Sequence, residues 1–470
     1  MNSLNPFTTL TENQLEKIKQ ATERLFETTG FTMEDAGLLK KARACGAQVD
    51  DTNGRVRIPP PLLRELLAQV PPKYTIRGIL GDQWEVGGDQ QHGMAIITDP
   101  WIIDYPTQRP RHPNLEDVRR HTIIAQQMDP VASISRMDYP VTDYPDATSS
   151  LRALEAHLLL HSRHYWVMPA TMESMSQWFE IIQIVTGGGD CRGMMTAGIA
   201  VVSPLILNSL NCELLVRAVE AGFPVVPTIC PMAGSTSPYS LAGTLLQANV
   251  EALMVAIMSQ IIRPGAPFLY AVGTSATDMR SGHDLYYTMD KVLWKPAISQ
   301  LGLSYHLPTA AECGGSLTFR YDQQSGAEGM LFMLAAHASK SHMLCGFGSC
   351  HNANGMSAEM MLIQREYLQA ARFLARGINT DDFHLGLANI TSAGPGGNFM
   401  MDDLTMAHLR GDEFFQSKLF DFSGGNREGQ SLLEKAHQRV EEMVAGFQSP
   451  VPGNIQEKLR RHFHNLYASI

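Results

Sequence analysis

The chain has 470 residues, of which 44% are hydrophobic and 18% are charged. This is enough apolar material for a large buried core, and too little charge for a disordered or coiled-coil protein. The formal net charge of -10 offers nothing to attract a polyanion, so we expect no nucleic-acid partner.

The same composition predicts a cytoplasmic protein. Residues 1–10 lack the charged start and apolar run of a signal peptide, and no uninterrupted run of about 18 apolar residues predicts a membrane span. The chain has seven cysteines and no Cys-x-x-Cys pair, which favours a reduced compartment.

Residues 1–112 predict an N-terminal extension of helices and β-hairpins. Apolar side chains at helical spacing begin after Thr11, and Thr11 with Gln14 fits a capping box. A leucine-rich helix follows Pro59 and Pro60. Short β-rich stretches come next, and we expect the last of them to pair back on the others; they lie at 74–79, 84–86, 94–98 and 102–105.

Between residues 113 and 400, helical patterns alternate with short, almost wholly apolar runs. Strands covered on both faces have this composition. Seven helix–strand units can be counted, and the Gly-x-Gly-x-x-Gly turn of a doubly wound sheet is missing, so we predict an α/β fold with a TIM-type (β/α)8 barrel. The expected strands are 131–135, 165–169, 193–202, 225–229, 267–273, 303–306 and 343–347, with 95–98 as the candidate for the eighth.

A polar, helical pattern over residues 401–470 predicts a C-terminal tail on the outside of the barrel. Apolar helix faces and methionines predict a homo-oligomer.

Catalytic groups of a barrel lie at the carboxyl ends of its strands and in the loops that follow. These positions carry aromatic, methionine and neutral polar side chains without paired carboxylates, which argues against a glycosidase. A Gly-x-Ser-x-Gly elbow is also missing, so a serine hydrolase is not supported. The strand-end positions are Arg136 to Tyr139, Met168, Ser203, Cys230, Met232, Thr274, Ser275, His306 and Cys350 to Asn352, with Trp101 and Tyr105 nearby from the N-terminal hairpin.

We expect no tightly bound metal. His157 and His161 lie one turn apart, but the Glu of a His-Glu-x-x-His site is absent, so the pair indicates two satisfied histidines on a helix face. Cys350 beside His351 leaves zinc-thiolate methyl transfer open as an alternative.

Ordered segments over nearly the whole chain resemble the trimethylamine methyltransferase family. They are Ser240-Leu-Ala-Gly-Thr, Asn249-Val-Glu-Ala-Leu, Ile262-Arg-Pro-Gly-Ala-Pro, Asp278-Met-Arg-Ser-Gly and Pro395-Gly-Gly-Asn-Phe. In the last of these, Asn398 stands where the family usually has His. Members that carry pyrrolysine demethylate trimethylamine, but Gln323 or a neighbour occupies that place here. The sequence therefore resembles the non-pyrrolysine branch, whose members act on glycine betaine or related quaternary amines.

The resemblance implies a barrel that moves a methyl group from a quaternary amine to the Co(I) of a corrinoid (cobalamin) on a separate protein, with no cofactor tightly bound in this chain. Glycine betaine, giving dimethylglycine, is the expected substrate; proline betaine, carnitine and butyrobetaine are alternatives. A quaternary ammonium leaves as a neutral amine, so the enzyme mainly positions the reactants. A non-catalytic quaternary-amine binding protein also remains open.

A betaine needs an aromatic cage for its cation and a polar contact for its carboxylate. The cage is expected among Trp101, Tyr105, Tyr139, Tyr144 and Trp166. The carboxylate contact is expected among Arg136, Arg280, His351 and Asn352. We assign His351 and Asn352 to the catalytic site, with His351 facing the barrel mouth and binding the carboxylate.

Overall fold

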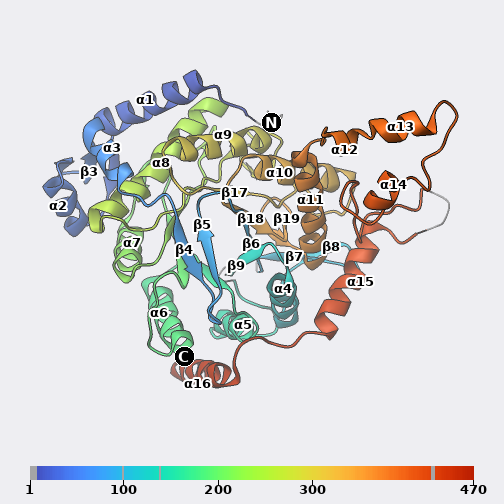
Figure 1. Ribbon diagram of the computed structural model, residues 1–470. Coiled ribbons are helices and arrows are strands. Elements are labelled where there is room, and N and C mark those ends of the chain that lie inside the picture. Colours follow the sequence, from blue (N-terminus) through green and yellow to red (C-terminus); the bar gives the residue numbers. More distant parts are fainter. Residues whose placement is uncertain (1–7, 98–99, 137–138, 425–428) are drawn as a thin grey trace.

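The structure, a computed structural model, describes residues 8–97, 100–136, 139–424 and 429–470, with the side chain of Arg136 outside that description (Figure 1). Helix α1 (Glu12–Thr28) begins with the predicted capping box, in which Thr11 and Gln14 exchange side chain–backbone hydrogen bonds. Two further helices and three short strands complete the N-terminal segment; they are β1 (Phe31–Met33), α2 (Ala36–Ala44), β2 (Gln48–Asp50), β3 (Arg55–Arg57) and α3 (Pro60–Ala68). β1 pairs with β12 (Ile206–Leu207), which joins this segment to the rest of the molecule.

A curled parallel sheet of seven strands forms the centre of the molecule, so the mixed α/β fold is confirmed. Its order is β13-β11-β10-β9-β6-β18-β17. Residues 267–270 form parallel bridges to both edges of this sheet, from Phe268 to Val225 of β13 and from Tyr270 to Thr309 beside β17. The strands are β6 (His92–Ile96), β9 (Val131–Arg136), β10 (His164–Val167), β11 (Met195–Ala200), β13 (Val225–Thr228), β17 (Ala310–Glu312) and β18 (Met343–Phe347).

Two expectations about strands were wrong. Residues 303–306 were expected to form a strand, but α9 (Asp290–Ser304) continues into them and β17 follows after Pro308. A short apolar run has no periodicity that separates a helix end from a buried strand. The stretch 102–105 was expected to pair with its β-rich neighbours, whereas β7 (Trp101–Asp104) pairs with β8 (Arg109–Arg111) and β20 (Gly355–Met356).

The described part of the proposed last strand, 95–98, overlaps β6, which lies between β9 and β18. β6 therefore occupies the position between β9 and β18, for which the sequence offered only this candidate strand.

Helices cover the outer face of the sheet (Figure 1). One of them, α8 (Leu241–Ile262), is long and apolar enough to cross a membrane, but 83% of its apolar window is buried inside the molecule. The other covering helices are α4 (Leu115–Gln127), α5 (Ser149–Leu158), α6 (Met172–Thr186), α7 (Ser209–Ala221), α10 (Gln323–Ala338) and α11 (Ala358–Arg376). The remaining short strands are β14 (Met232–Ala233), β15 (Ser275–Thr277), β16 (Asp284–Leu285) and β19 (Ser349–Cys350). The chain ends with α12 (Asp382–Leu385), α13 (Leu387–Ala393), α14 (Asp403–His408), α15 (Leu432–Ala445) and α16 (Gly453–Ser469).

The hairpin of β4 (Tyr74–Arg77) and β5 (Gln83–Val86) covers the amino ends of the strands. The Arg77 backbone N–H donates to the Gly193 carbonyl at 2.7 Å, just before β11, and the Ile79 N–H donates to the Ser162 carbonyl at 2.9 Å, just before β10. Tyr74 and other apolar hairpin residues pack against the inner face of the sheet. A functional site is therefore sought at the opposite, carboxyl ends of the strands.

Candidate functional site

Glu312, the last residue of β17, forms the centre of a cluster of charged side chains. The Lys291 Nζ lies 2.6 Å from Glu312 Oε2, and the Lys295 Nζ lies 3.7 Å from the same oxygen. Both lysines come from α9 and are almost fully buried, with 1% and 3% of their side chains exposed, whereas 23% of the Glu312 side chain is exposed. Of the three charged groups, the carboxylate is thus the one that an incoming molecule can contact.

Two tyrosines after β16 cover this cluster. The Tyr286 hydroxyl donates to Glu312 Oε1, and the Lys291 Nζ lies 3.0 Å from the centre of the Tyr286 ring, a cation–π contact. The Tyr287 hydroxyl hydrogen-bonds with Ser349 Oγ at 3.0 Å. A Cβ at Gly315 would lie 2.4 Å from the Tyr287 ring, so only glycine lets this ring pack directly on the backbone after β17.

The charges of the cluster follow from the balance between burial and attraction. Burial acts to raise the pKa of Glu312, but Lys291 and Lys295 outweigh it and hold that pKa below its usual value. Burial lowers the pKa of Lys291 against the attraction of Glu312, and lowers the pKa of Lys295 to about 8. Burial also raises the pKa of Tyr286 well above its usual value. At neutral pH the carboxylate is therefore ionised and the tyrosine keeps its proton.

Asn352 connects the loop after β19 to the tyrosine pair. Its Oδ1 accepts a hydrogen bond from the Tyr286 backbone N–H at 2.7 Å, and its Nδ2 donates to the Asp284 carbonyl at 2.7 Å. His351 beside it turns its ring edge-on to Phe319, with 4.8 Å between the ring centres. Both residues have left-handed backbone conformations, with φ of +47° for His351 and +53° for Asn352.

His351 and Asn352 line a hollow of about 510 Å³. The His351 Nδ1 is buried and makes no hydrogen bond within the described parts of the chain. Burial lowers the pKa of His351, so the ring is neutral at neutral pH. A neutral imidazole that lines a hollow can offer a substrate a hydrogen-bonding group. The other lining residues are His283, Asp284, Leu285, Leu317, Thr318, Phe319, Arg320 and Asn354.

Two of the predicted cage residues lie close to the strand ends. Trp101 stacks on His112 with 4.0 Å between ring centres, and its backbone N–H donates to the Asn354 carbonyl at 3.1 Å, next to the His351 loop. Trp166 on β10 is buried among the inner-face side chains of the sheet. The structure thus places the Trp101 backbone beside Asn354, two residues after Asn352, and Trp101 is not among the residues that line the hollow.

The remaining predicted site residues have other surroundings. Tyr105 stacks on His437 of α15 at 3.5 Å, and Arg152 lies over the Tyr144 ring at 4.4 Å. The Arg280 side chain is 93% exposed and pairs with Asp278 at 3.2 Å. The structure does not bring these three into the Glu312 cluster. Tyr139 is half-buried, Arg136 ends β9 without a described side chain, and Met137 and Asp138 lie outside the described residues.

The Glu312 cluster was not predicted from the sequence, because the strand was expected at 303–306. Pro308 followed by an apolar run that ends in Glu312 would have been the better signal, since it puts a carboxylate at a catalytic strand end. Lys291 and Lys295 were also detectable, because they lie four residues apart on the same face of a helix that covers the sheet.

A parallel α/β sheet whose polar groups gather at the carboxyl ends of its strands is the arrangement of an enzyme that binds a small molecule there. The sequence profile of the trimethylamine methyltransferase (MTTB) family matches residues 1–468. The chain belongs to this family and is a methyltransferase.

Individual relatives match nearly the whole chain. It is 27% identical to a glycine betaine methyltransferase of Desulfitobacterium hafniense (strain Y51), over 95% of this chain and 94% of that protein. It is 25% identical to a trimethylamine methyltransferase of D. hafniense (strain DSM 10664 / DCB-2), with coverages of 95% and 91%, and 25% identical to an L-carnitine:corrinoid methyltransferase of Eubacterium limosum, with coverages of 95% and 95%. Superposition on the monomethylamine methyltransferase of Methanosarcina barkeri gives a TM-score of 0.48 at 12% identity, covering 94% of this chain and 93% of that one.

Proposed function

We propose that this protein transfers a methyl group from a quaternary amine to the Co(I) of a corrinoid carried by a separate protein. Relatives that match it over 95% of its length are named as glycine betaine and L-carnitine:corrinoid methyltransferases. Glycine betaine is the proposed substrate and dimethylglycine the product. Proline betaine, carnitine and butyrobetaine are the substrates to compare with it.

The observation that carries this proposal is the pairing of an ionised, accessible carboxylate with a neutral histidine at the same end of the sheet. Of the Glu312 side chain 23% is exposed, against 1% and 3% of the two lysine side chains. A substrate cation therefore meets the carboxylate before it meets the lysines. The neutral His351 ring, which lines the hollow, supplies a hydrogen bond for the substrate carboxylate, which loses water when it binds.

The reaction needs positioning more than activation. Co(I) attacks the methyl carbon, the carbon–nitrogen bond breaks, and its electron pair stays on the nitrogen, which leaves as a neutral tertiary amine. The residues of this chain hold the cation, orient one methyl group towards the cobalt and keep water away. Asn352 contributes by fixing the backbone of Tyr286, whose hydroxyl donates to Glu312.

We further propose that residues 267–270 serve as the eighth strand of a TIM-type (β/α)8 barrel. Their bridges to both edges of the sheet support this. The barrel then takes in β6 together with residues 113–400, and the helical segments before it and after residue 401 lie outside it.

The zinc-thiolate alternative is less well supported. Burial raises the pKa of Cys230 to about 11 and raises those of Cys313 and Cys345 further, which favours thiols over thiolates. The group of potential metal ligands found among the described residues contains no cysteine, and includes neither Cys350 nor His351.

A spectral assay tests the proposal. The purified protein is mixed with cob(I)alamin and one amine at a time, and methylcob(III)alamin is followed by absorbance. We expect methylation with quaternary amines and none with trimethylamine. Methylation with trimethylamine alone, or with no amine at all, would rule out the proposed substrate class.

A further inference from the structure

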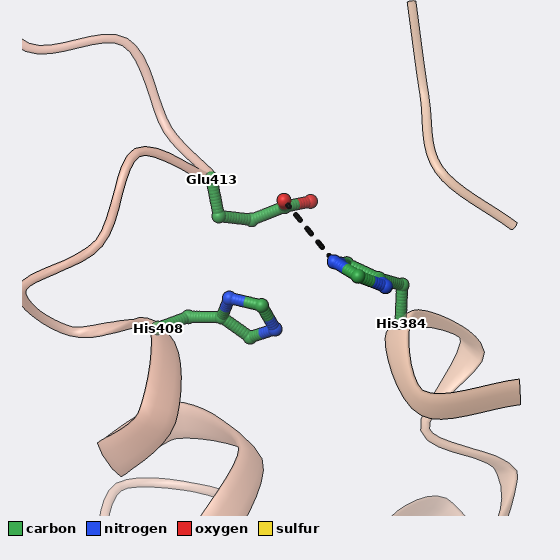
Figure 2. Close-up of side chains that lie close together, drawn as sticks. All are labelled: His384, His408 and Glu413. Carbon is green, nitrogen blue, oxygen red and sulfur yellow. Dashed lines mark ion pairs between the residues drawn. The ribbon is translucent and has the colours of Figure 1, made fainter. Parts of the chain in front are cut away.

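Three side chains of metal-ligating type meet in the C-terminal part of the chain, separate from the strand ends. His384 lies in α12, His408 is the last residue of α14, and Glu413 lies in the loop that follows. One ligand atom from each lies within 4.8 Å of the other two, and His384 Nε2 is 3.9 Å from Glu413 Oε2. Figure 2 shows both rings and the carboxylate directed into a common space.

Neighbouring groups hold these side chains in place. The His384 Nδ1 lies 2.7 Å from Asp381 Oδ1, so this carboxylate orients the ring and leaves Nε2 for another partner. A carboxylate on the second nitrogen is the usual support of a histidine that binds a metal. Arg376 donates to the backbone carbonyls of Asp412 and Glu413, both at 2.7 Å, and so fixes the loop.

The ligand types and distances suit zinc. Two imidazoles and one carboxylate form a common zinc-binding set with an open fourth position. Zinc–ligand bonds of about 2.0–2.2 Å place tetrahedral ligand atoms about 3.3 Å apart. His384 and Glu413 are already close to that spacing, and small side-chain rotations bring in His408, which is half-buried like the other two.

The surrounding segment lacks a core of its own. All residues of α12, α13 and α14 are described, and none of them is buried. Large apolar side chains there are exposed, including Leu387 at 72%, Met400 at 81% and Met401 at 83%. Segments that bury little apolar surface often depend on a metal ion for their order.

We propose that His384, His408 and Glu413 bind one zinc ion, with water in the fourth position, and that this ion fixes α12, α14 and the Glu413 loop relative to one another. The site is independent of the methyl-transfer site. The sequence shows no cluster of metal ligands and so predicted no bound metal, since these three ligands come from separate segments and form no spacing motif. Their meeting in space is the reason to replace that expectation.

Calorimetric titration of the full-length, chelator-treated protein with Zn²⁺ tests the site. We expect one equivalent to bind, and His408→Ala and Glu413→Gln each to weaken binding by roughly 100-fold. His464→Ala, which removes an exposed histidine of α16, is the matched control and leaves binding unchanged. A wild-type protein that binds no zinc, or a His408→Ala variant that binds it as tightly as the wild type, overturns the proposal.

Two further measurements test the assignment. The spectrum of bound Co²⁺ separates this site from adventitious cysteine sites, and proteolysis tests the proposed structural role of the ion. Co²⁺ bound by nitrogen and oxygen ligands lacks the strong near-ultraviolet band of Co²⁺ bound by thiolate, and we expect that band to be absent. Zn²⁺ should also slow proteolytic cleavage between residues 377 and 424 by roughly tenfold in the wild type and not in His408→Ala. A thiolate band, or equal cleavage with and without Zn²⁺, contradicts the assignment.

Discussion

Replacing Glu312 with Gln tests whether its carboxylate holds the buried charge cluster together. The substitution keeps the size of the side chain but removes the only negative charge among the three groups described above. Lys291 and Lys295, of which 1% and 3% are exposed, would then remain buried with no opposite charge within 4 Å in the described structure. A buried charge that loses its partner is strongly destabilising.

The magnitude follows from the two distances. At an effective dielectric constant of about 20, separations of 2.6 and 3.7 Å correspond to roughly 6 and 4 kcal/mol of attraction. Part of this is offset, because the variant no longer removes a carboxylate from water, which costs several kcal/mol. We therefore expect Glu312→Gln to lower the free energy of unfolding by about 3 kcal/mol, the lower end of the usual range, since Glu312 is partly exposed.

Urea unfolding at neutral pH measures this loss. The matched control is Glu457→Gln, which breaks a surface pair with Arg461 whose side chains are both 72% exposed, and should change stability by less than about 0.5 kcal/mol. Adding Lys295→Met to Glu312→Gln should recover at least about 1 kcal/mol, since one uncompensated charge is gone. A Glu312→Gln variant as stable as the control would refute the electrostatic account of this cluster.

Three further outcomes follow from the same site. Burial lowers the pKa of Lys295 to about 8 from the usual 10.5, so between these pH values the unfolded chain binds a proton on Lys295 that the folded chain has lost. The stability of the wild type should therefore rise with pH across that window relative to Lys295→Met. Parallel profiles of stability against pH for the two proteins would contradict this. His351→Ala should reduce turnover of glycine betaine by about ten- to a hundredfold, as expected for a lost hydrogen bond to a charged group. It should not affect turnover of tetramethylammonium, which lacks the carboxylate. Equal losses of turnover on both substrates, or no loss on either, would contradict the proposed role of His351. Asn352→Ala should destabilise the protein by about 1–3 kcal/mol and slow methyl transfer, because the Tyr286 and Asp284 backbone groups lose their partner; a variant with normal stability and turnover would argue against that positioning role.

The sequence was most informative where a long apolar pattern and the tertiary packing agree. The apolar strand β18 appears at the predicted position, 343–347, because it is buried and its composition reflects this. The prediction failed at 303–306, where a helix end, a turn and a short strand follow one another within ten residues. Local apolarity alone cannot separate those three states.

Whether a site residue could be predicted depended in the same way on whether its strand was placed correctly. His351 and Asn352 could be predicted because the strand before them, β18, was predicted at its correct position. Glu312 was missed because its strand, β17, was expected at 303–306. The His384, His408 and Glu413 group was beyond pattern recognition, since its members meet only after α12 and α14 have packed. Long-range meetings of single polar residues leave no periodicity in a sequence.

The most direct test of the central claim is the ratio of products when the protein, cob(I)alamin and glycine betaine react under strictly anaerobic conditions. Dimethylglycine is measured by mass spectrometry and methylcob(III)alamin by absorbance in the same sample. Methyl transfer to cobalt predicts that the two appear in equal amounts and that neither forms without the protein. Dimethylglycine formed without methylcob(III)alamin, or neither product formed with any of the four betaines, would contradict the account.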